Sequence, residues 1–142
     1  MNMCKAAYIE LRRISSIRKY LSVDSTKTLM CSLVLSRLDY CNSILSCSSQ
    51  YLLQKLQKVQ NTAARIIVRV PRSENSSPLL CTLHWLCIRS IIKHKICSLC
   101  YTALTGSSPT YLSDHTHVYT TARYVRSSSD TRILIIPTMK MK

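Results

Sequence analysis

The stretch that decides the fold is LLQKLQKVQNTAARIIVRVPR, residues 52–72. At a helical step of about 100° per residue, one arc about 100° wide collects a stripe of apolar side chains. We therefore predict a helix that packs this stripe into a core. Pro71 has no amide hydrogen and restricts the residue before it, so the helix should end near Val70. The stripe consists of Leu52, Leu56, Val59, Ala63, Ile66, Ile67 and Val70.

The same helical wheel places basic side chains on a second arc, centred about 120° from the apolar one. Phosphate binding needs cations spaced along one face, and each neutralised phosphate releases a counterion, so affinity falls with salt. We hypothesise that this arc contacts the backbone of RNA or DNA. A solvated helix face gives the same pattern, and the wheel does not separate the two readings. The arc holds Lys55, Lys58, Arg65, Arg69 and Arg72.

Composition favours a basic, helical protein of one domain plus a tail. The 142 residues include 20 Lys and Arg against six acids, for a net charge of +14. Such a charge favours a polyanion or an acidic membrane surface as partner, or it only keeps the protein solvated. A single glycine argues against a β-rich fold, because tight hairpins need residues that accept positive φ.

Targeting and membrane signals are weak in this sequence. Residues 1–10 contain no apolar leader segment, so we expect the eight cysteines to be reduced and the protein intracellular, in nucleus or cytoplasm. The longest run without charge, residues 96–113, is rich in Ser and Thr, and we expect no membrane span.

The first two predicted helices form an antiparallel hairpin. Apolar spacing predicts a helix over residues 4–21 and a second over 25–46, with Asp24 as its N-cap. Glu10 and Arg37 lie inside the two apolar stripes at similar distances from the corner. We predict that they form an ion pair, because a charge on an apolar face needs a partner. The alternative is that Arg37 extends to the surface along its aliphatic stem.

Shorter helices should follow residues 52–72. Ser77 and Pro78 start one that ends near residue 83, and a longer helix covers 88–104, ended by Gly106. Between them His84 and Trp85 interrupt the pattern, and we expect Trp85 to anchor packing between helices. One further helical turn follows Pro109. The predicted fold is mainly α, a small helical bundle made of the hairpin plus two to three further helices.

Beyond residue 114 the periodicity fails. We predict a helical domain over residues 1–114 and a basic, extended or disordered tail over 115–142. Within the tail, Arg123 and Arg126 alternate with Tyr and Ser and are candidate nucleic-acid-binding residues. A basic tail without a ligand explains them equally well.

A zinc site is the one cofactor that the spacing suggests. Cys81, His84, Cys97 and Cys100 form the pattern C-x2-H-x12-C-x2-C. The last two cysteines fall inside a predicted helix, and small buried thiols are the commoner explanation. We therefore predict no metal and no cofactor.

Several stretches together resemble the region after the catalytic palm in reverse transcriptases of LINE-type, non-long-terminal-repeat retrotransposons. They keep their order and cover nearly the whole chain. They are KAAYIELRRISSIRKYLS (5–22), SRLDYCNSIL (36–45), LQKVQNTAARIIVRVP (56–71), TLHWL (82–86), KICSLCY (95–101), PTYL (109–112) and RYVRSSSDTRILIIP (123–137).

The resemblance implies a helical, thumb-like region that helps to hold template and primer in an intact RNA-directed DNA polymerase. It does not imply polymerisation by this chain. The family's Tyr-x-Asp-Asp box is absent, and no two acids lie within nine residues, whereas two-metal chemistry needs clustered carboxylates. The alternatives are a pseudogene-like remnant without selected activity and a helical protein-interaction module.

Overall fold

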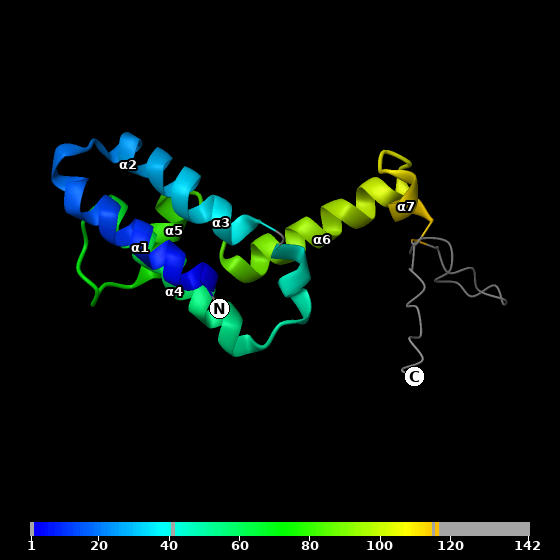
Figure 1. Ribbon diagram of the computed structural model, residues 1–142, viewed down its shortest axis with the longest axis horizontal. Helices are drawn as coiled ribbons and strands as arrows, with labels where there is room; N and C mark the ends of the chain where they lie inside the picture. The colour runs from blue at the N-terminus through cyan, green and yellow to red at the C-terminus, as the bar shows by residue number, and fades with distance from the viewer. Residues whose placement is uncertain (1, 41, 115, 117–142) are drawn as a thin grey trace. The chain divides into compact units, whose positions relative to one another are not determined.

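The computed structural model describes residues 2–40, 42–114 and 116, and within these ranges it contains seven α-helices and no strand (Figure 1). The prediction of a mainly α fold is confirmed. The chain divides into a first unit, residues 1–95, and a second that begins at Ile96. The helices are α1 (Asn2–Ile17), α2 (Val23–Met30), α3 (Ser36–Asp39), α4 (Gln50–Val68), α5 (Ser76–Thr82), α6 (Ile88–Leu104) and α7 (Thr110–Ser113).

The predicted boundary at residue 114 stays a prediction. The proposed tail, including Arg123 and Arg126, lies outside the described residues apart from Thr116. Of the described helices, none is both long enough and apolar enough to cross a membrane.

Helix α1 and the α2–α3 segment form the predicted hairpin, and α1 contacts both α2 and α3 (Figure 1). The N-cap of α2 is Ser22, whose hydroxyl accepts a hydrogen bond from the Ser25 amide at 3.1 Å. The prediction of Asp24 as N-cap is therefore wrong. Asp24 lies in the first turn instead, where its negative charge interacts favourably with the helix dipole.

The second helix of the hairpin is shorter and less regular than predicted. A π-helical segment, Cys31–Leu35, separates α2 from α3, and α3 ends at Asp39 rather than near residue 46. Tyr40 is extended, and a 3-10 segment follows over Asn42–Cys47. The wide π turn shifts the phase of the helix, and Leu38 is buried. Ile44, which lies beyond the end of α3 in the 3-10 segment, is 74% exposed.

Helix α4 is the centre of the first unit and packs against α1, α2 and α5. Leu56, Val59, Ala63 and Ile67 are fully buried, which confirms the predicted apolar stripe at these positions. The helix ends at Val68, two residues before the predicted end, because Arg69 adopts a left-handed conformation with φ of 62°.

Two glutamines of α4 hold the corner between α5 and α6. The side-chain oxygen of Gln57 accepts a hydrogen bond from the Ile88 amide at 2.9 Å, and the amide of Gln60 donates to the Leu86 carbonyl at 2.8 Å. Gln57 also donates to Gln60, which is buried. The two glutamines thus supply hydrogen-bond partners for backbone groups at and just before the start of α6. The bounds of α6 agree with the prediction.

The described part of the second unit follows its predicted pattern. Gly106 has a φ of 72°, and the Ser107 amide donates to the Thr102 carbonyl at 3.1 Å, as expected of a glycine that ends a helix. Helix α7 forms the further turn predicted after Pro109.

Candidate nucleic-acid interface

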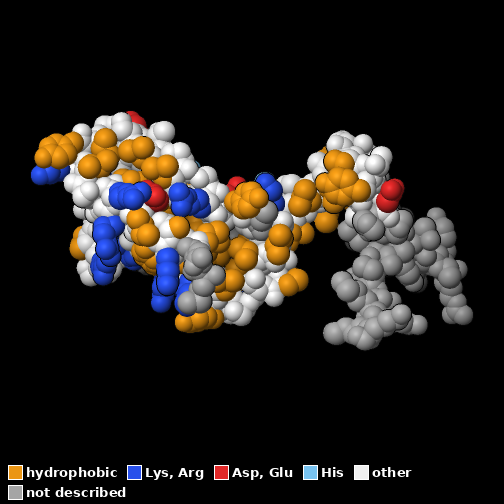
Figure 2. Space-filling model, viewed as in Figure 1, with side chains coloured by type: hydrophobic (Ala, Val, Ile, Leu, Met, Phe, Trp, Pro, Cys, Tyr) orange, Lys and Arg blue, Asp and Glu red, His pale blue; other side chains and the backbone are white. Residues whose placement is uncertain are grey.

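Two adjoining depressions, of about 550 and 480 Å³, lie between α1 and the C-terminal end of α4. They share Ser15, Thr62, Ile66 and Arg72, so we treat them as one site and name it the cationic hollow. Figure 2 shows Lys and Arg side chains along the visible side of the first unit, with an acid among them. The polar side chains that line the hollow are those of Tyr8, Arg12, Ser15, Ser16, Arg18, Thr62, Arg65, Arg69 and Arg72.

Arg18 is buried in this hollow and binds protein carbonyls. Its Nε donates to the Ile66 carbonyl at 3.1 Å, and its two terminal nitrogens donate to the carbonyls of Leu21 and Ile67, both at 2.7 Å. The contacts with Ile66 and Ile67 cap the C-terminal end of α4, where carbonyls lack helical partners, and the contact with Leu21 is local. Burial, with a smaller contribution from Arg69, lowers the pKa of Arg18. Arg18 is therefore a structural cation, and the sequence analysis missed it.

Arg69 completes a reciprocal contact between the residues that directly follow α1 and α4. Its guanidinium donates to the Arg18 carbonyl at 2.9 Å, while Arg18 caps the helix that Arg69 terminates. The predicted wheel does not apply to Arg69 or Arg72, because both follow the end of α4. Both nevertheless line the cationic hollow.

Arg65 and Arg72 present donors to the hollow. Arg65 donates one terminal nitrogen to the Glu74 carbonyl at 3.1 Å, whereas its buried Nε has no partner among the described residues. Arg72 is exposed and forms no hydrogen bond or ion pair within the described residues. The exposed guanidinium of Arg72 can bind the oxygens of an anion.

Lys55 and Lys58 do not line the hollow. Both precede it along α4, and the ammonium of Lys55 lies 4.2 Å from the centre of the Tyr51 ring. Lys58 is exposed and lies one turn before Thr62, so it extends the basic surface away from the hollow. The predicted set of five cations is thus divided between the hollow and the preceding turns of α4.

Arg12 also lines the hollow, and unlike Arg65, Arg69 and Arg72 it was not predicted from the sequence. It lies on α1 and lines the hollow with Ser15 and Ser16, because these residues share one helix face at about 100° per residue. Glu10 lies about 160° away on that wheel. Among the described residues that line the hollow there is no carboxylate, so its cations have no acidic neighbour in its walls.

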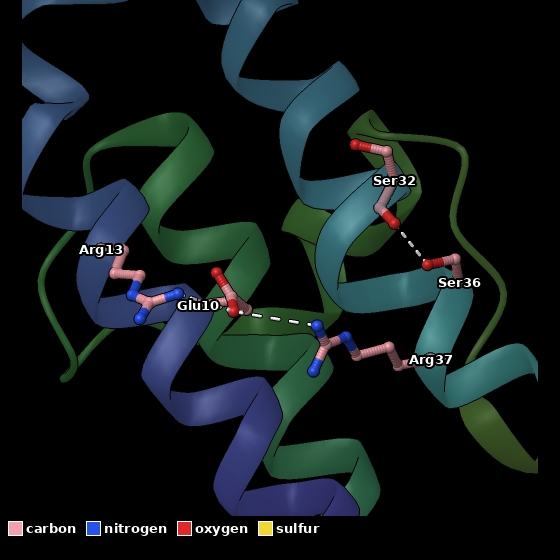
Figure 3. Close-up of polar contacts among 5 residues, drawn as sticks. All are labelled: Glu10, Arg13, Ser32, Ser36 and Arg37. Atoms are coloured by element: carbon pink, nitrogen blue, oxygen red, sulfur yellow. Dashed lines mark hydrogen bonds and ion pairs between the residues drawn. The ribbon is translucent and has the colours of Figure 1, made fainter.

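The predicted ion pair between Glu10 and Arg37 is confirmed. A terminal nitrogen of Arg37 lies 3.8 Å from a carboxylate oxygen of Glu10 (Figure 3). Arg13 binds the same oxygen at 3.2 Å, a partner that the sequence analysis missed. The Glu10 side chain is 13% exposed and that of Arg37 is 45% exposed, so Arg37 also reaches solvent as the alternative proposed. Outside the cationic hollow, on the side of α1 that carries Glu10, the carboxylate thus offsets the charges of Arg13 and Arg37.

A third depression, of about 430 Å³, is of a different kind, and we name it the Trp85 hollow. Trp85 lines it and is partly buried, while its backbone amide donates to the Leu80 carbonyl at 2.8 Å. No Lys or Arg is among its lining residues. The full lining is Cys31, Leu35, Ser36, Leu38, Asp39, Asn42, Gln60, His84, Trp85, Leu86, Ile88 and Ile91.

The cysteine and histidine pattern gathers no metal site in the described ranges, where no three His, Cys, Asp or Glu side chains lie close enough together. The expectation that its cysteines are buried is wrong for Cys81 and Cys97, which are exposed. Cys97 lies on a side of α6 that faces solvent, because helical burial depends on the face and not on the residue type.

The resemblance to LINE-type reverse transcriptases stays a prediction, since no protein-family model, no curated protein and no solved structure matches the chain. In space, three of the stretches that carry the resemblance meet at the Trp85 hollow. Asp39 and Asn42 come from SRLDYCNSIL, Gln60 from LQKVQNTAARIIVRVP, and Trp85 from TLHWL.

Proposed function

We propose that this chain is a non-catalytic, helical region of a LINE-type reverse transcriptase that binds the backbone of RNA or DNA electrostatically and without reading sequence. The proposal of family rests on the seven matching stretches, and the absence of clustered acids in the sequence argues against polymerisation by the chain itself.

The observation that carries the binding proposal is the composition of the cationic hollow. Arg12 from α1 and Arg72 line one depression, Arg65, Arg69 and Arg72 line the adjoining one, and no acid is among the lining residues of either. Ser15 adds a hydroxyl donor between the arginines, whereas the hydroxyls of Ser16 and Thr62 donate to backbone carbonyls of their own helices. Phosphate oxygens accept hydrogen bonds from both kinds of group, and such contacts position a backbone without specifying bases.

Charge around the hollow supports the same proposal. Residues 1–95 contain fifteen Lys and Arg against four acids. One of these acids, Glu10, is paired with Arg13 and Arg37 on another face of α1. A field of this sign raises the local concentration of a polyanion and speeds its association.

Binding measured against salt tests the proposal. For a duplex, the logarithm of the binding constant should fall with the logarithm of salt concentration by about 0.9 for each phosphate neutralised. We expect a slope of at least about 3, since four arginines besides the structural Arg18 line the hollow. Duplexes of different sequence should give the same affinity at one salt concentration.

A matched pair of double variants assigns the effect to the hollow. Arg12→Gln with Arg72→Gln removes two cations from it, and the slope should fall by about 2. Lys93→Gln with Lys95→Gln removes two exposed cations that do not line the hollow, and should change the slope less. Binding insensitive to salt, or an equal loss in both variants, would contradict the proposal.

A further inference from the structure

Three local irregularities of the fold border the Trp85 hollow. Cys31 and Leu35 belong to the π-helical segment, His84 has a φ of 56°, and Asn42 is only 3% exposed. The side-chain oxygen of Asn42 has no hydrogen-bond partner among the described residues. Each feature costs free energy, and π turns and strained residues occur disproportionately at ligand sites. Their convergence on one depression indicates a binding site.

The orientation of Asn42 determines which group it offers. Its side-chain nitrogen donates to a carboxylate oxygen of Asp39 at 2.5 Å. Because the nitrogen must face the carboxylate, the amide oxygen is left as an acceptor. The second oxygen of Asp39 forms no hydrogen bond within the described residues. The Trp85 indole N–H and the His84 ring also line the hollow without a hydrogen bond among the described residues. The buried Asn42 oxygen and the Asp39 carboxylate are nevertheless two acceptors side by side, and they suit a ligand that brings adjacent donors.

The rest of the lining suits a flat ring. Leu35, Leu38, Leu86 and Ile91 give apolar walls, and Trp85 adds an aromatic face on which another ring can stack. A volume of about 430 Å³ lies near the lower end of the range for ligand pockets, roughly 300–1,000 Å³. The hollow has room for one or two fused rings.

Charge disfavours two other ligand classes. A phosphate finds no Lys or Arg in this lining. A cationic ligand would be attracted by Asp39 but opposed by the surrounding unit, whose fifteen basic residues outnumber its four acids. The balance favours donors that belong to a neutral ring.

We propose that the Trp85 hollow binds a nucleobase, guanine above the others, stacked on Trp85 with its N–H donors directed at Asp39 and Asn42. Guanine places two adjacent donors on its Watson–Crick edge, which match a carboxylate and a neighbouring acceptor. The base comes from a free nucleoside or from an unpaired nucleotide in a strand. The inference adds base recognition to the proposed function and does not depend on it, because a nucleoside carries no phosphate.

Trp85 is the only tryptophan, so its fluorescence reports on the hollow directly. Guanosine, titrated with excitation at the red edge of tryptophan absorption, should quench the signal saturably, and uridine should quench it far less. Asp39→Asn keeps the shape of an exposed side chain but removes the charged acceptor, and should weaken guanosine binding about tenfold. Asp24→Asn, an equal charge change on an exposed residue at the start of α2, should leave it unchanged.

Two further measurements distinguish a free nucleoside from a nucleotide in a strand and check that the variants are folded. Single-stranded oligoguanylate that binds no tighter than guanosine in high salt would assign the site to a nucleoside, and tighter binding would assign it to a strand. Circular dichroism of each variant confirms that the helices remain. Linear quenching, equal quenching by uridine, or full binding by Asp39→Asn would overturn the proposal.

Discussion

The two hollows of the first unit differ in the hydrogen-bonding groups that they present. The cationic hollow presents guanidinium donors, of which Arg72 has no partner among the described residues. The Trp85 hollow contains two neighbouring acceptors, the buried oxygen of Asn42 and the Asp39 carboxylate, and no Lys or Arg. Buried polar groups are normally paired, so groups left without a partner indicate the chemistry of the ligand. The first fits an anion and the second a neutral ring with N–H groups.

The comparison also separates structural cations from ligand-binding ones. Arg18 is within the cationic hollow, yet its guanidinium is occupied by three protein carbonyls. Arg72 lines the same surface without such contacts. Net charge alone would count the two equally, whereas the hydrogen bonds assign the first to stability and the second to binding.

The largest effect on stability should come from Arg18→Leu, which leaves two carbonyls at the end of α4 and the local Leu21 carbonyl without their donor. Unpaired buried groups and a lost charged contact should lower the free energy of unfolding by about 3 kcal/mol. Arg18→Lys should recover less than half of the loss, since an ammonium lacks the planar fork. Urea denaturation measures both.

Arg12→Leu is the control for that prediction, because Arg12 is exposed and forms no hydrogen bond within the described residues. It should change the free energy of unfolding by no more than about 0.5 kcal/mol. An equal destabilisation by both variants would mean that Arg18 has no special structural role.

A smaller effect is expected at Arg69, where backbone strain and a hydrogen bond coincide. Its left-handed φ of 62° suits glycine, while its guanidinium binds the Arg18 carbonyl. Both Arg69→Ala and Arg69→Gly lose the hydrogen bond, but only glycine relieves the strain. The glycine variant should be more stable than the alanine variant by about 1 kcal/mol in thermal or urea unfolding. Equal stabilities would show that the left-handed conformation is not maintained.

Glu10→Gln tests the carboxylate that offsets the cations on the far side of α1. Removing it leaves Arg13 and Arg37 without their acidic partner. Because both arginines are partly exposed, the loss should be at most about 1 kcal/mol. Glu74→Gln, at an exposed acid without an ion pair within the described residues, should cost less. If Glu74→Gln costs as much as Glu10→Gln, the Glu10 cluster contributes nothing specific.

The smallest perturbation uses Cys87, which lies between two lining residues of the Trp85 hollow. A hydrogen bond with Ser90, at 3.1 Å between sulfur and oxygen, lowers the pKa of the Cys87 thiol. A lower pKa raises the thiolate fraction at neutral pH, so Cys87 should be alkylated faster than exposed Cys47, and Ser90→Ala should slow it. Saturating guanosine should protect Cys87 and leave Cys47 unaffected. Mass spectrometry of alkylated peptides measures these rates.

Local patterns in the sequence predicted much of the helical structure. The bounds of α6 agree with the prediction, because its apolar spacing begins at Ile88 and Gly106 supplies the left-handed ending. The Glu10–Arg37 pair was also predictable, since two charges in two apolar stripes at matching heights have few other partners.

Features that depend on distant contacts or on rare backbone states were not predictable from the sequence. Arg18 binds carbonyls 48 and 49 residues away, and its spacing on α1 resembles that of any basic residue. The π turn at Cys31–Leu35 changes the helix phase without a sequence signal. The regular spacing predicted for the helix over residues 25–46 therefore does not hold after Val34. The cationic hollow needed Arg12 from another helix, so a wheel of α4 alone described only part of it.

The most direct test of the account is a crossed measurement on the two hollows, using one preparation of each variant. Arg12→Gln with Arg72→Gln should weaken duplex binding and flatten its salt dependence while guanosine still quenches Trp85 fully. Asp39→Asn should do the reverse, losing guanosine binding about tenfold with the salt slope intact. If each variant instead impairs both activities to the same extent, the two hollows are not separate sites and the account is contradicted.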